Sequence, residues 1–276
     1  MDLKQALKGK LSVRELEALR KSFDSVGSIA ILEIPKELER KEKTIAKELL
    51  KLHKHFRTVA KKVQGRQGKY RTSKLKVIAG EKNLVADYKE SGCSFKVSLG
   101  KVYFSPRLSS ERLRIAKQVK NGEKVGVFFA GAGPYCIVIA KHSKAEKIYG
   151  FEWNPKAVKD FEENIKRNKM QGRVFAVKGD VKKTAKKFKG FFDRIAMPAP
   201  QTSWNYLKAA LASCRKKAII HFYCFTDTEN PFGKALERLK KISVKEKIKL
   251  KVLSKKVVRP YSKKKCQIVL DLEVKK

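Results

Sequence analysis

Residues 125–155, VGVFFAGAGPYCIVIAKHSKAEKIYGFEWNP, constrain the fold of this chain more than any other stretch. The apolar run Val125–Ala130 predicts a buried strand, and the small residues 131–133 predict a tight turn after it. A helix is expected over Tyr135–Lys141, and a second strand over Ile148–Phe151. A strand, a glycine turn, a helix and a strand in this order predict a doubly wound sheet that binds its ligand at the carboxyl ends of the strands.

Glu152 follows the second predicted strand, about 20 residues after the turn, where a carboxylate can accept hydrogen bonds from ribose hydroxyls. Gly131 and Gly133 lack a Cβ, so a ligand could approach the backbone of the turn closely. A dinucleotide site would require a third glycine, but position 136 is Cys, and no G-x-x-x-x-G-K-[ST] loop is present. The pattern therefore favours an adenosine-bearing cofactor without a pyrophosphate, of which S-adenosylmethionine is the commonest. The alternative is an ordinary tight turn beside a solvated glutamate.

Charge indicates the partner. The chain has 67 Lys and Arg against 27 Asp and Glu, a formal net charge of +40. Such a field attracts polyanions and releases their counterions, so a nucleic acid is the expected partner, with a lysine-biased proteome as the alternative explanation. No apolar stretch approaches the roughly 18 residues of a membrane span, and the charged N-terminus shows no secretory signal. We therefore expect a cytoplasmic protein that binds no membrane.

The cysteines and histidines show no metal-ligand spacing. The five cysteines are odd in number and form no C-x-x-C pair, and the four histidines form no cluster. We expect reduced cysteines in or near the core, and no metal site. The cysteines are Cys93, Cys136, Cys214, Cys224 and Cys266.

The apolar pattern divides the chain into two predicted α/β domains, 1–100 and 101–276. In the first, short helices are expected within residues 1–22 and a longer helix over Glu37–His55. Residues Phe95–Phe104 are expected to form a strand pair or one bent strand. In the second, alternating strands and helices end in an antiparallel strand pair, Lys249–Val258 and Cys266–Val274. This order predicts a Rossmann-type methyltransferase domain. Its first helix should span Glu111–Val119, with Ser109 or Ser110 as N-cap.

Several stretches together resemble one known family. They are YFSPRLSSERLRIA (103–116), FFAGAGP (128–134), FEWNP (151–155), ENIKRNKM (163–170), GDV (179–181), DRIAMPAP (193–200), IIHFYCF (219–225) and RPYSKKKCQIVLDLEV (259–274). In this combination the chain resembles the archaeal and eukaryotic tRNA guanine-N1 methyltransferases, which modify guanosine-37 beside the anticodon. A sister family transfers the aminocarboxypropyl group of the same cofactor in wyosine synthesis. The SPRL sequence at 105–108 and the Gly133-Pro134 pair favour the methyltransferase.

The resemblance implies catalytic roles for two residues. Glu111 would accept the N1 proton of guanine, and Arg71 would stabilise the negative charge that develops on the base O6. Without the resemblance, Glu111 could equally be a first-turn acid that stabilises its helix dipole, and Arg71 would be an ordinary surface cation.

The resemblance also places S-adenosylmethionine, with Glu152 on the ribose and Asp180 on the adenine side. The residues expected to bind it are Phe129, Ala130, Gly131, Gly133, Pro134, Glu152, Asp180, Val181 and Met197. The residues expected to bind the substrate are Arg107, Arg112, Pro198, Pro200 and Gln201. Two positions depart from the family pattern: Val127 stands where the family usually has an acid, and Pro198 stands for the Asn that orients the target base.

The function implied is N1-methylation of guanosine-37, with the base flipped into a pocket between Arg71, Glu111 and residues 197–201. The expected partner is the tRNA anticodon stem-loop, held by the small domain and the basic surface of a monomer. Two alternatives stay open. One is a wyosine-pathway enzyme that methylates a tricyclic guanosine derivative at carbon or transfers the aminocarboxypropyl group. The other is an RNA-binding relative that has lost catalysis.

Overall fold

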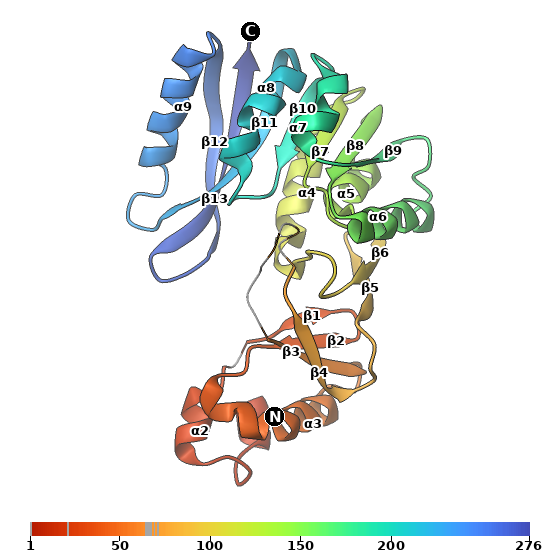
Figure 1. Cartoon of the computed structure of the whole chain (residues 1–276), viewed down its shortest axis with the longest axis vertical. Coiled ribbons are helices and arrows are strands. Elements are labelled where there is room, and N and C mark those ends of the chain that lie inside the picture. The colour runs from red at the N-terminus through yellow and green to blue at the C-terminus, as the bar shows by residue number, and fades with distance from the viewer. Residues whose placement is uncertain (1, 21, 64–67, 69, 71) are drawn as a thin grey trace. The chain divides into compact units, whose positions relative to one another are not determined.

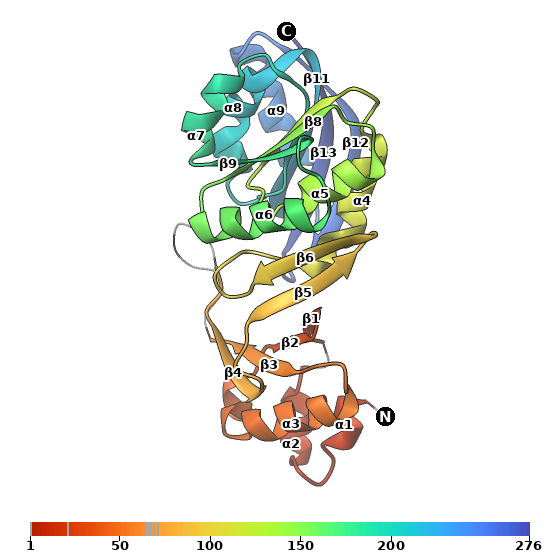
Figure 2. The same cartoon turned by 90° about the vertical axis from the view of Figure 1, so that its right-hand side faces the viewer.

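The computed structural model describes residues 2–20, 22–63, 68, 70 and 72–276. The chain forms two compact units, Met1–Arg107 and Leu108–Lys276, and each has its own apolar core. Figure 1 and Figure 2 show the elements of both units in two views. All five cysteines are buried and free, as expected. None of the helices in the described part of the chain is long and apolar enough to span a membrane.

The first unit contains a four-stranded sheet in the order β1-β2-β3-β4 and a separate ribbon of β5 and β6. The helix α3 (Glu42–Leu52) covers the sheet and buries Ile45, Ala46 and Leu49. The short helices α1 (Leu3–Ala6) and α2 (Val13–Ala18) each begin with a capping box. The strands are β1 (Asp24–Val26), β2 (Ile29–Leu32), β3 (Thr58–Lys62), β4 (Leu75–Gly80), β5 (Val85–Glu90) and β6 (Cys93–Ser98).

Two predictions for this unit need correction. The helix predicted over Glu37–His55 begins as a 3-10 helix, Lys36–Lys41, and becomes α-helical only at Glu42. The strand expected over Phe95–Phe104 ends at Ser98, because the chain turns there and continues only through an isolated bridge between Leu99 and Val102.

The second unit is built on a seven-stranded sheet in the order β12-β13-β11-β10-β7-β8-β9. Only β13 runs antiparallel to the others. The strands are β7 (Lys124–Phe128), β8 (Lys147–Glu152), β9 (Val174–Lys178), β10 (Phe192–Met197), β11 (Cys214–Asp227), β12 (Lys249–Pro260) and β13 (Lys265–Lys275). This order confirms the Rossmann-type fold, including the closing antiparallel pair.

Helices cover both faces of this sheet, as Figure 2 shows. One face carries α4 (Ser109–Gln118), α5 (Pro134–His142) and α6 (Pro155–Arg167). The other carries α7 (Val181–Thr184), α8 (Leu207–Ser213) and α9 (Gly233–Lys245), with the 3-10 turns η3 (Ala185–Phe188) and η4 (Ser203–Tyr206). The 3-10 turn η2 (Pro106–Leu108) precedes α4, whose N-cap is Leu108, so the prediction of a serine cap was wrong.

The strand order identifies the edge where a ligand should bind. β7 lies between β8 and β10, so successive crossovers leave it in opposite directions. In open α/β sheets, ligands bind beyond the carboxyl ends of the strands at this topological switch point. We refer below to this side of the sheet as the carboxyl edge, and to the opposite side as the amino edge.

Candidate functional site

Two hydrogen bonds from backbone N–H groups connect the glycine turn after β7 to the end of β8. The Ala130 N–H donates to the carbonyl of Phe151 (2.9 Å), and the Gly131 N–H donates to Glu152 Oε2 (2.7 Å). Phe129 and Gly131 both have positive φ, 60° and 58°. A positive φ is uncommon for a residue other than glycine, so the backbone at Phe129 is strained. Backbone strain of this kind is concentrated at functional sites.

The Glu152 carboxylate is held at the carboxyl edge by backbone donors. Gly131 N–H contacts one oxygen, and Asn154 N–H contacts the other (2.7 Å). Partial burial raises the pKa of Glu152, and the N–H groups of Asn154, Gly131 and Trp153 act in the opposite direction. A carboxylate has about four lone-pair sites, so beside these three N–H groups Glu152 can still accept a hydrogen bond from a ribose hydroxyl. This fixed acceptor therefore fits an adenosine-bearing cofactor.

The structure shows why position 133 must be glycine, and this cause differs from the one expected from the sequence. A Cβ at Gly133 would lie 1.9 Å from the ring of Phe161, and a Cβ at Gly150 would lie 2.4 Å from the same ring. Both glycines therefore allow α6 to pack against the turn and β8, whereas close approach of a ligand was our expectation for Gly133. Buried Asn164 of α6 reinforces this contact, since its Nδ2 donates to the Ala132 carbonyl (3.0 Å).

Asp180 lies after β9 and caps α7 by accepting from the Lys182 N–H (2.9 Å). Burial, together with the nearby Asp180 carboxylate, raises the pKa of Tyr206. The ring of Tyr206 also packs on Phe129, with ring centroids 4.9 Å apart. Tyr206 thus connects two predicted cofactor residues, and our sequence analysis missed it because it comes from a separate segment before α8. Val181, another predicted cofactor residue, is buried.

The loop after β10 is held from within by Ser203. The Ser203 hydroxyl lies 3.0 Å from the Met197 carbonyl and 2.9 Å from the Ala199 carbonyl. The Ala199 N–H donates to the Met197 carbonyl (2.9 Å), which folds the chain tightly around Pro198. Met197 is buried, Pro198 and Pro200 are partly buried, and Gln201 is exposed. The turn thus has a fixed backbone even without an amide side chain at position 198.

Glu111, the predicted proton acceptor, is only 2% exposed. Its Oε1 accepts from the Tyr223 hydroxyl (2.7 Å) and from Arg114 Nη2 (2.8 Å). Arg114 Nε lies 2.9 Å from Oε2, and Lys256 Nζ lies 3.7 Å from the same oxygen. The carboxylate is therefore fixed in position and faces cationic groups from α4 and β12.

A buried network extends from Arg114 across the sheet. Arg114 Nη1 donates to Asp271 (2.7 Å), and Asp271 lies 2.6 Å from His221 Nδ1. Arg194 Nη1 lies 2.8 Å from His221 Nε2, so the neutral ring donates from Nδ1 and accepts at Nε2. Burial lowers the pKa of His221 although Asp271 opposes the shift. Burial alone would raise the pKa of Asp271, but His221 and Arg114 hold it well below its usual range.

The predicted arginines occupy different environments. Arg107 is exposed, and its Nε donates to Asp24 (2.6 Å). Arg112 is 2% exposed, and its guanidinium lies 5.9 Å from the centre of the Tyr135 ring. At this distance the guanidinium is within range of a cation–π contact with the ring. Arg71 lies outside the described residues.

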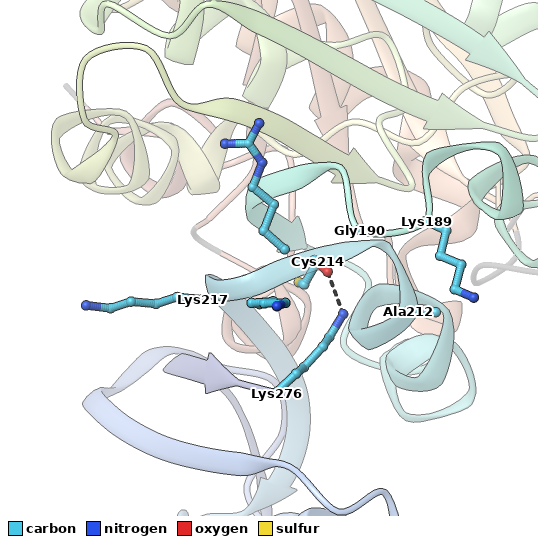
Figure 3. Close-up of a pocket in the computed structure, with 8 residues that line it drawn as sticks. Lys189, Gly190, Ala212, Cys214, Lys217 and Lys276 are labelled. Carbon is cyan, nitrogen blue, oxygen red and sulfur yellow. Dashed lines mark hydrogen bonds between the residues drawn. The ribbon is translucent and has the colours of Figure 1, made fainter.

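A cavity of about 510 Å³ lies at the amino edge, and it contains none of the predicted site residues (Figure 3). Lys276 reaches the carbonyl of Cys214, whereas the side chain of Lys217 extends away from both. The cavity is lined by Lys189, Gly190, Ala212, Cys214, Arg215, Lys216, Lys217 and Lys276. It is thus a basic surface on the side of the sheet remote from Glu152.

Comparison with protein families gives two matches that together span most of the chain. Residues 86–253 match the TRM5/TYW2 methyltransferase domain, and residues 3–83 match the TYW2 N-terminal domain. Trm5b of Pyrococcus abyssi, a tRNA (guanine(37)-N(1))-methyltransferase, is 39% identical over 92% of this chain and 74% of its own length. The tRNA (guanine(37)-N(1))/4-demethylwyosine(37)-methyltransferase Taw22 of Nanoarchaeum equitans is 44% identical over 54% of this chain and 49% of its own.

Solved structures show the same fold. The complex of aTrm5 and tRNALeu has a TM-score of 0.88 and 30% identity, and covers 99% of this chain and 78% of the solved one. Trm5 of Methanocaldococcus jannaschii in complex with adenosine has a TM-score of 0.82 and 30% identity, covering 98% and 78%. With the glycine turn, Glu152 and the strand order, these matches show that the chain belongs to the TRM5/TYW2 methyltransferase family.

Proposed function

We propose that the chain is an S-adenosylmethionine-dependent tRNA methyltransferase that forms N1-methylguanosine at position 37. The observation that carries this proposal is that the second unit holds two carboxylates in fixed orientations. Glu152 is oriented by backbone N–H groups beside the glycine turn, and Glu111 is oriented by Tyr223 and Arg114. The names and bound molecules of the similar proteins support the same activity.

The residues at the switch point would bind the adenosine half of the cofactor. Glu152 would accept from the ribose hydroxyls, and Asp180 and Phe129 would lie on the adenine side next to Tyr206. S-adenosylmethionine, when bound, supplies an electrophilic methyl group. Val127 is buried within β7 and carries no charge, so any contact to the methionine amino group must come from other residues.

Glu111 would act as the base. Guanine N1 carries a proton, which must leave as the bond between N1 and the methyl carbon forms. A carboxylate within hydrogen-bond distance can accept this proton. Tyr223 and Arg114 hold Glu111 in one orientation, which reduces the reorganisation needed during transfer. Arg71 remains the proposed partner for the base O6.

The proposed substrate is tRNA, presented through its anticodon stem-loop. The net charge of +40 supports binding to a polyanion. One copy of the second unit supplies both Glu111 and Glu152, so we expect a monomer to be active. A substrate of this kind is consistent with action in the cytoplasm.

A second product has specific support. The Nanoarchaeum equitans relative is named for both guanine-37 and 4-demethylwyosine-37 methylation and is 44% identical over 149 residues. In this chain Pro198 provides no amide to read one particular base edge. We therefore keep methylation of a tricyclic guanosine derivative as the alternative activity, and aminocarboxypropyl transfer as the more distant one.

The roles of the two carboxylates can be tested by methyl transfer to a tRNA transcript with guanosine at position 37. We expect Glu111→Gln to lower kcat at least about 100-fold with cofactor affinity unchanged, because general-base catalysis supplies 10²–10⁴-fold. Glu152→Gln should instead weaken S-adenosylmethionine binding by about tenfold or more, measured by calorimetry. Tyr223→Phe should reduce kcat less than Glu111→Gln and change its pH profile. Wild-type turnover in Glu111→Gln would contradict the assignment.

A further inference from the structure

In the hairpin of β12 and β13, the strand β12 and the turn that joins it to β13 form a strongly basic segment of the second unit. Residues 249–265, KLKVLSKKVVRPYSKKK, contain eight Lys and Arg and no Asp or Glu. β12 is the edge strand of the sheet, and most of its side chains are exposed. All five residues from Tyr261 to Lys265 are exposed as well.

The hairpin extends beyond the carboxyl edge. β10 ends at Met197, which pairs with Phe222 of β11. β11 continues five residues further to Asp227, which pairs with Lys265 of β13. At about 3.3 Å per residue, β11 and β13 extend roughly 16 Å past the end of β10. The tip of the hairpin therefore lies on the same side of the sheet as Glu152 and the loop after β10.

The tip has a defined conformation. The N–H groups of Tyr261 and Ser262 both donate to the Lys265 carbonyl at 2.9 Å. Thr228, which follows β11, donates its N–H to the Lys264 carbonyl (3.1 Å). A lysine-rich tip held in this way presents its ammonium groups from a fixed backbone.

The need to keep an edge strand from pairing with other chains explains only part of the positive charge of this segment. Lysines on an edge strand prevent pairing with other chains, and this accounts for residues such as Lys249 and Lys251. It does not account for an exposed aromatic residue at the tip. Tyr261 is 56% exposed, and its ring lies 4.3 Å from that of Phe225, which fixes one side and leaves the rest accessible.

A buried amide, that of Gln267, lies beside this aromatic pair. Gln267 pairs with Phe225 across the sheet, is fully buried, and accepts from Arg259 Nε at 2.9 Å through Oε1. Among the residues that the structure describes, nothing accepts a hydrogen bond from Gln267 Nε2. Through Oε1, the Gln267 side chain thus holds the guanidinium of Arg259 beside the aromatic pair.

We propose that Lys255–Lys265 forms a contact surface for single-stranded RNA, with lysine ammonium groups on phosphates and the Tyr261 ring stacked on a base. This inference rests on the proposed function and identifies where the RNA strand beside the target nucleotide lies. Basic residues combined with an accessible aromatic ring are the recurring means of binding single-stranded nucleic acid.

The test compares two triple variants of equal charge. Lys255→Gln/Lys263→Gln/Lys264→Gln removes three cations from the hairpin. Lys189→Gln/Lys216→Gln/Lys217→Gln removes three from the cavity at the amino edge, shown in Figure 3. Binding of a guanosine-37 tRNA transcript is measured by fluorescence anisotropy at several salt concentrations without cofactor, after thermal melting has shown that each variant folds.

We expect the hairpin variant to reduce the slope of log K against log salt by about 2, since each lost phosphate contact in single strands contributes about 0.7. The amino-edge variant should leave that slope unchanged. Equal changes of the slope in both variants would show that binding depends on net charge alone, and would overturn the proposal. An unchanged slope in both variants would overturn it as well.

Substitution of Tyr261 tests the proposal independently of the lysines. Tyr261→Ala should weaken binding about tenfold, whereas Tyr261→Phe should bind like the wild type, because stacking needs the ring and not the hydroxyl. Equal affinity of Tyr261→Ala and wild type would refute the stacking contact. Binding is read without catalysis, so loss of methyl transfer with intact hairpin effects would contradict only the proposed function.

Discussion

At the scale of single residues, the absence of a Cβ at Gly133 allows α6 to pack against the turn after β7. Gly133 has φ +82° and faces the ring of Phe161, which also lies against Gly150. Asn164, one turn further along α6, donates to the carbonyl of Ala132. The position of the turn therefore depends on α6 as much as on the strand that precedes it.

This dependence predicts a large cost for a single methyl group. We expect Gly133→Ala to lower the free energy of unfolding by about 3–5 kcal/mol, from the left-handed backbone and the forced displacement of Phe161. Gly122→Ala is the matched control, because Gly122 has a similar φ of +75° and no atom within 4 Å of the added Cβ. It should cost only about 1–2 kcal/mol. Urea denaturation of both variants measures the difference, and equal costs would contradict the packing role.

At the scale of elements, α4, β11 and β13 are joined by buried charges. His221 and Tyr223 lie on the β11 face that meets α4, and Asp271 of β13 connects His221 to Arg114. Removing one partner from such a network leaves a buried charge unpaired, at a cost of about 3–5 kcal/mol. The network thus couples the position of Glu111 to the integrity of the sheet.

The network also predicts acid sensitivity. The folded state lowers the pKa of His221 below 6.5 and that of Asp271 below 3.8, so the unfolded chain binds more protons at both sites. The stability that His221 contributes is present above pH 6.5 and is lost as the pH falls below that value. The stability that Asp271 contributes is lost only as the pH falls below 3.8. We expect urea midpoints to decrease from pH 7.5 to pH 5. His221→Gln should flatten this dependence and His142→Gln should not; a flat wild-type profile would exclude the idea.

Periodicity predicted most elements of the second unit, because a Rossmann sheet alternates buried apolar strands with helices. It failed where local chemistry was ambiguous. The Ser109-Ser110 pair suggested an N-cap, but the preceding 3-10 turn makes Leu108 the cap. β3, at Thr58–Lys62, went unrecognised because its two lysines interrupt the pattern, and only pairing with β2 and β4 defines it.

At the scale of the whole molecule, the candidate site draws on residues far apart in the sequence. The sequence predicted Glu152 because its partner, the glycine turn, lies about 20 residues away. It gave no indication that Tyr223 or Asp271 would support Glu111, since those contacts span 112 residues and, through Arg114, 157 residues. Tyr206 was missed for the same reason, and the hairpin tip was recognised only as part of a family motif.

The central claim, that this chain methylates N1 of guanosine-37 in tRNA, is tested most directly by the identity of the product. A guanosine-37 transcript is incubated with the protein and S-adenosylmethionine, digested to nucleosides and analysed by mass spectrometry. We predict a 1-methylguanosine peak that is absent with an adenosine-37 transcript and absent with Glu111→Gln. A transcript that binds but yields no methylated guanosine, with methylation appearing only on a tricyclic precursor, would contradict the claim.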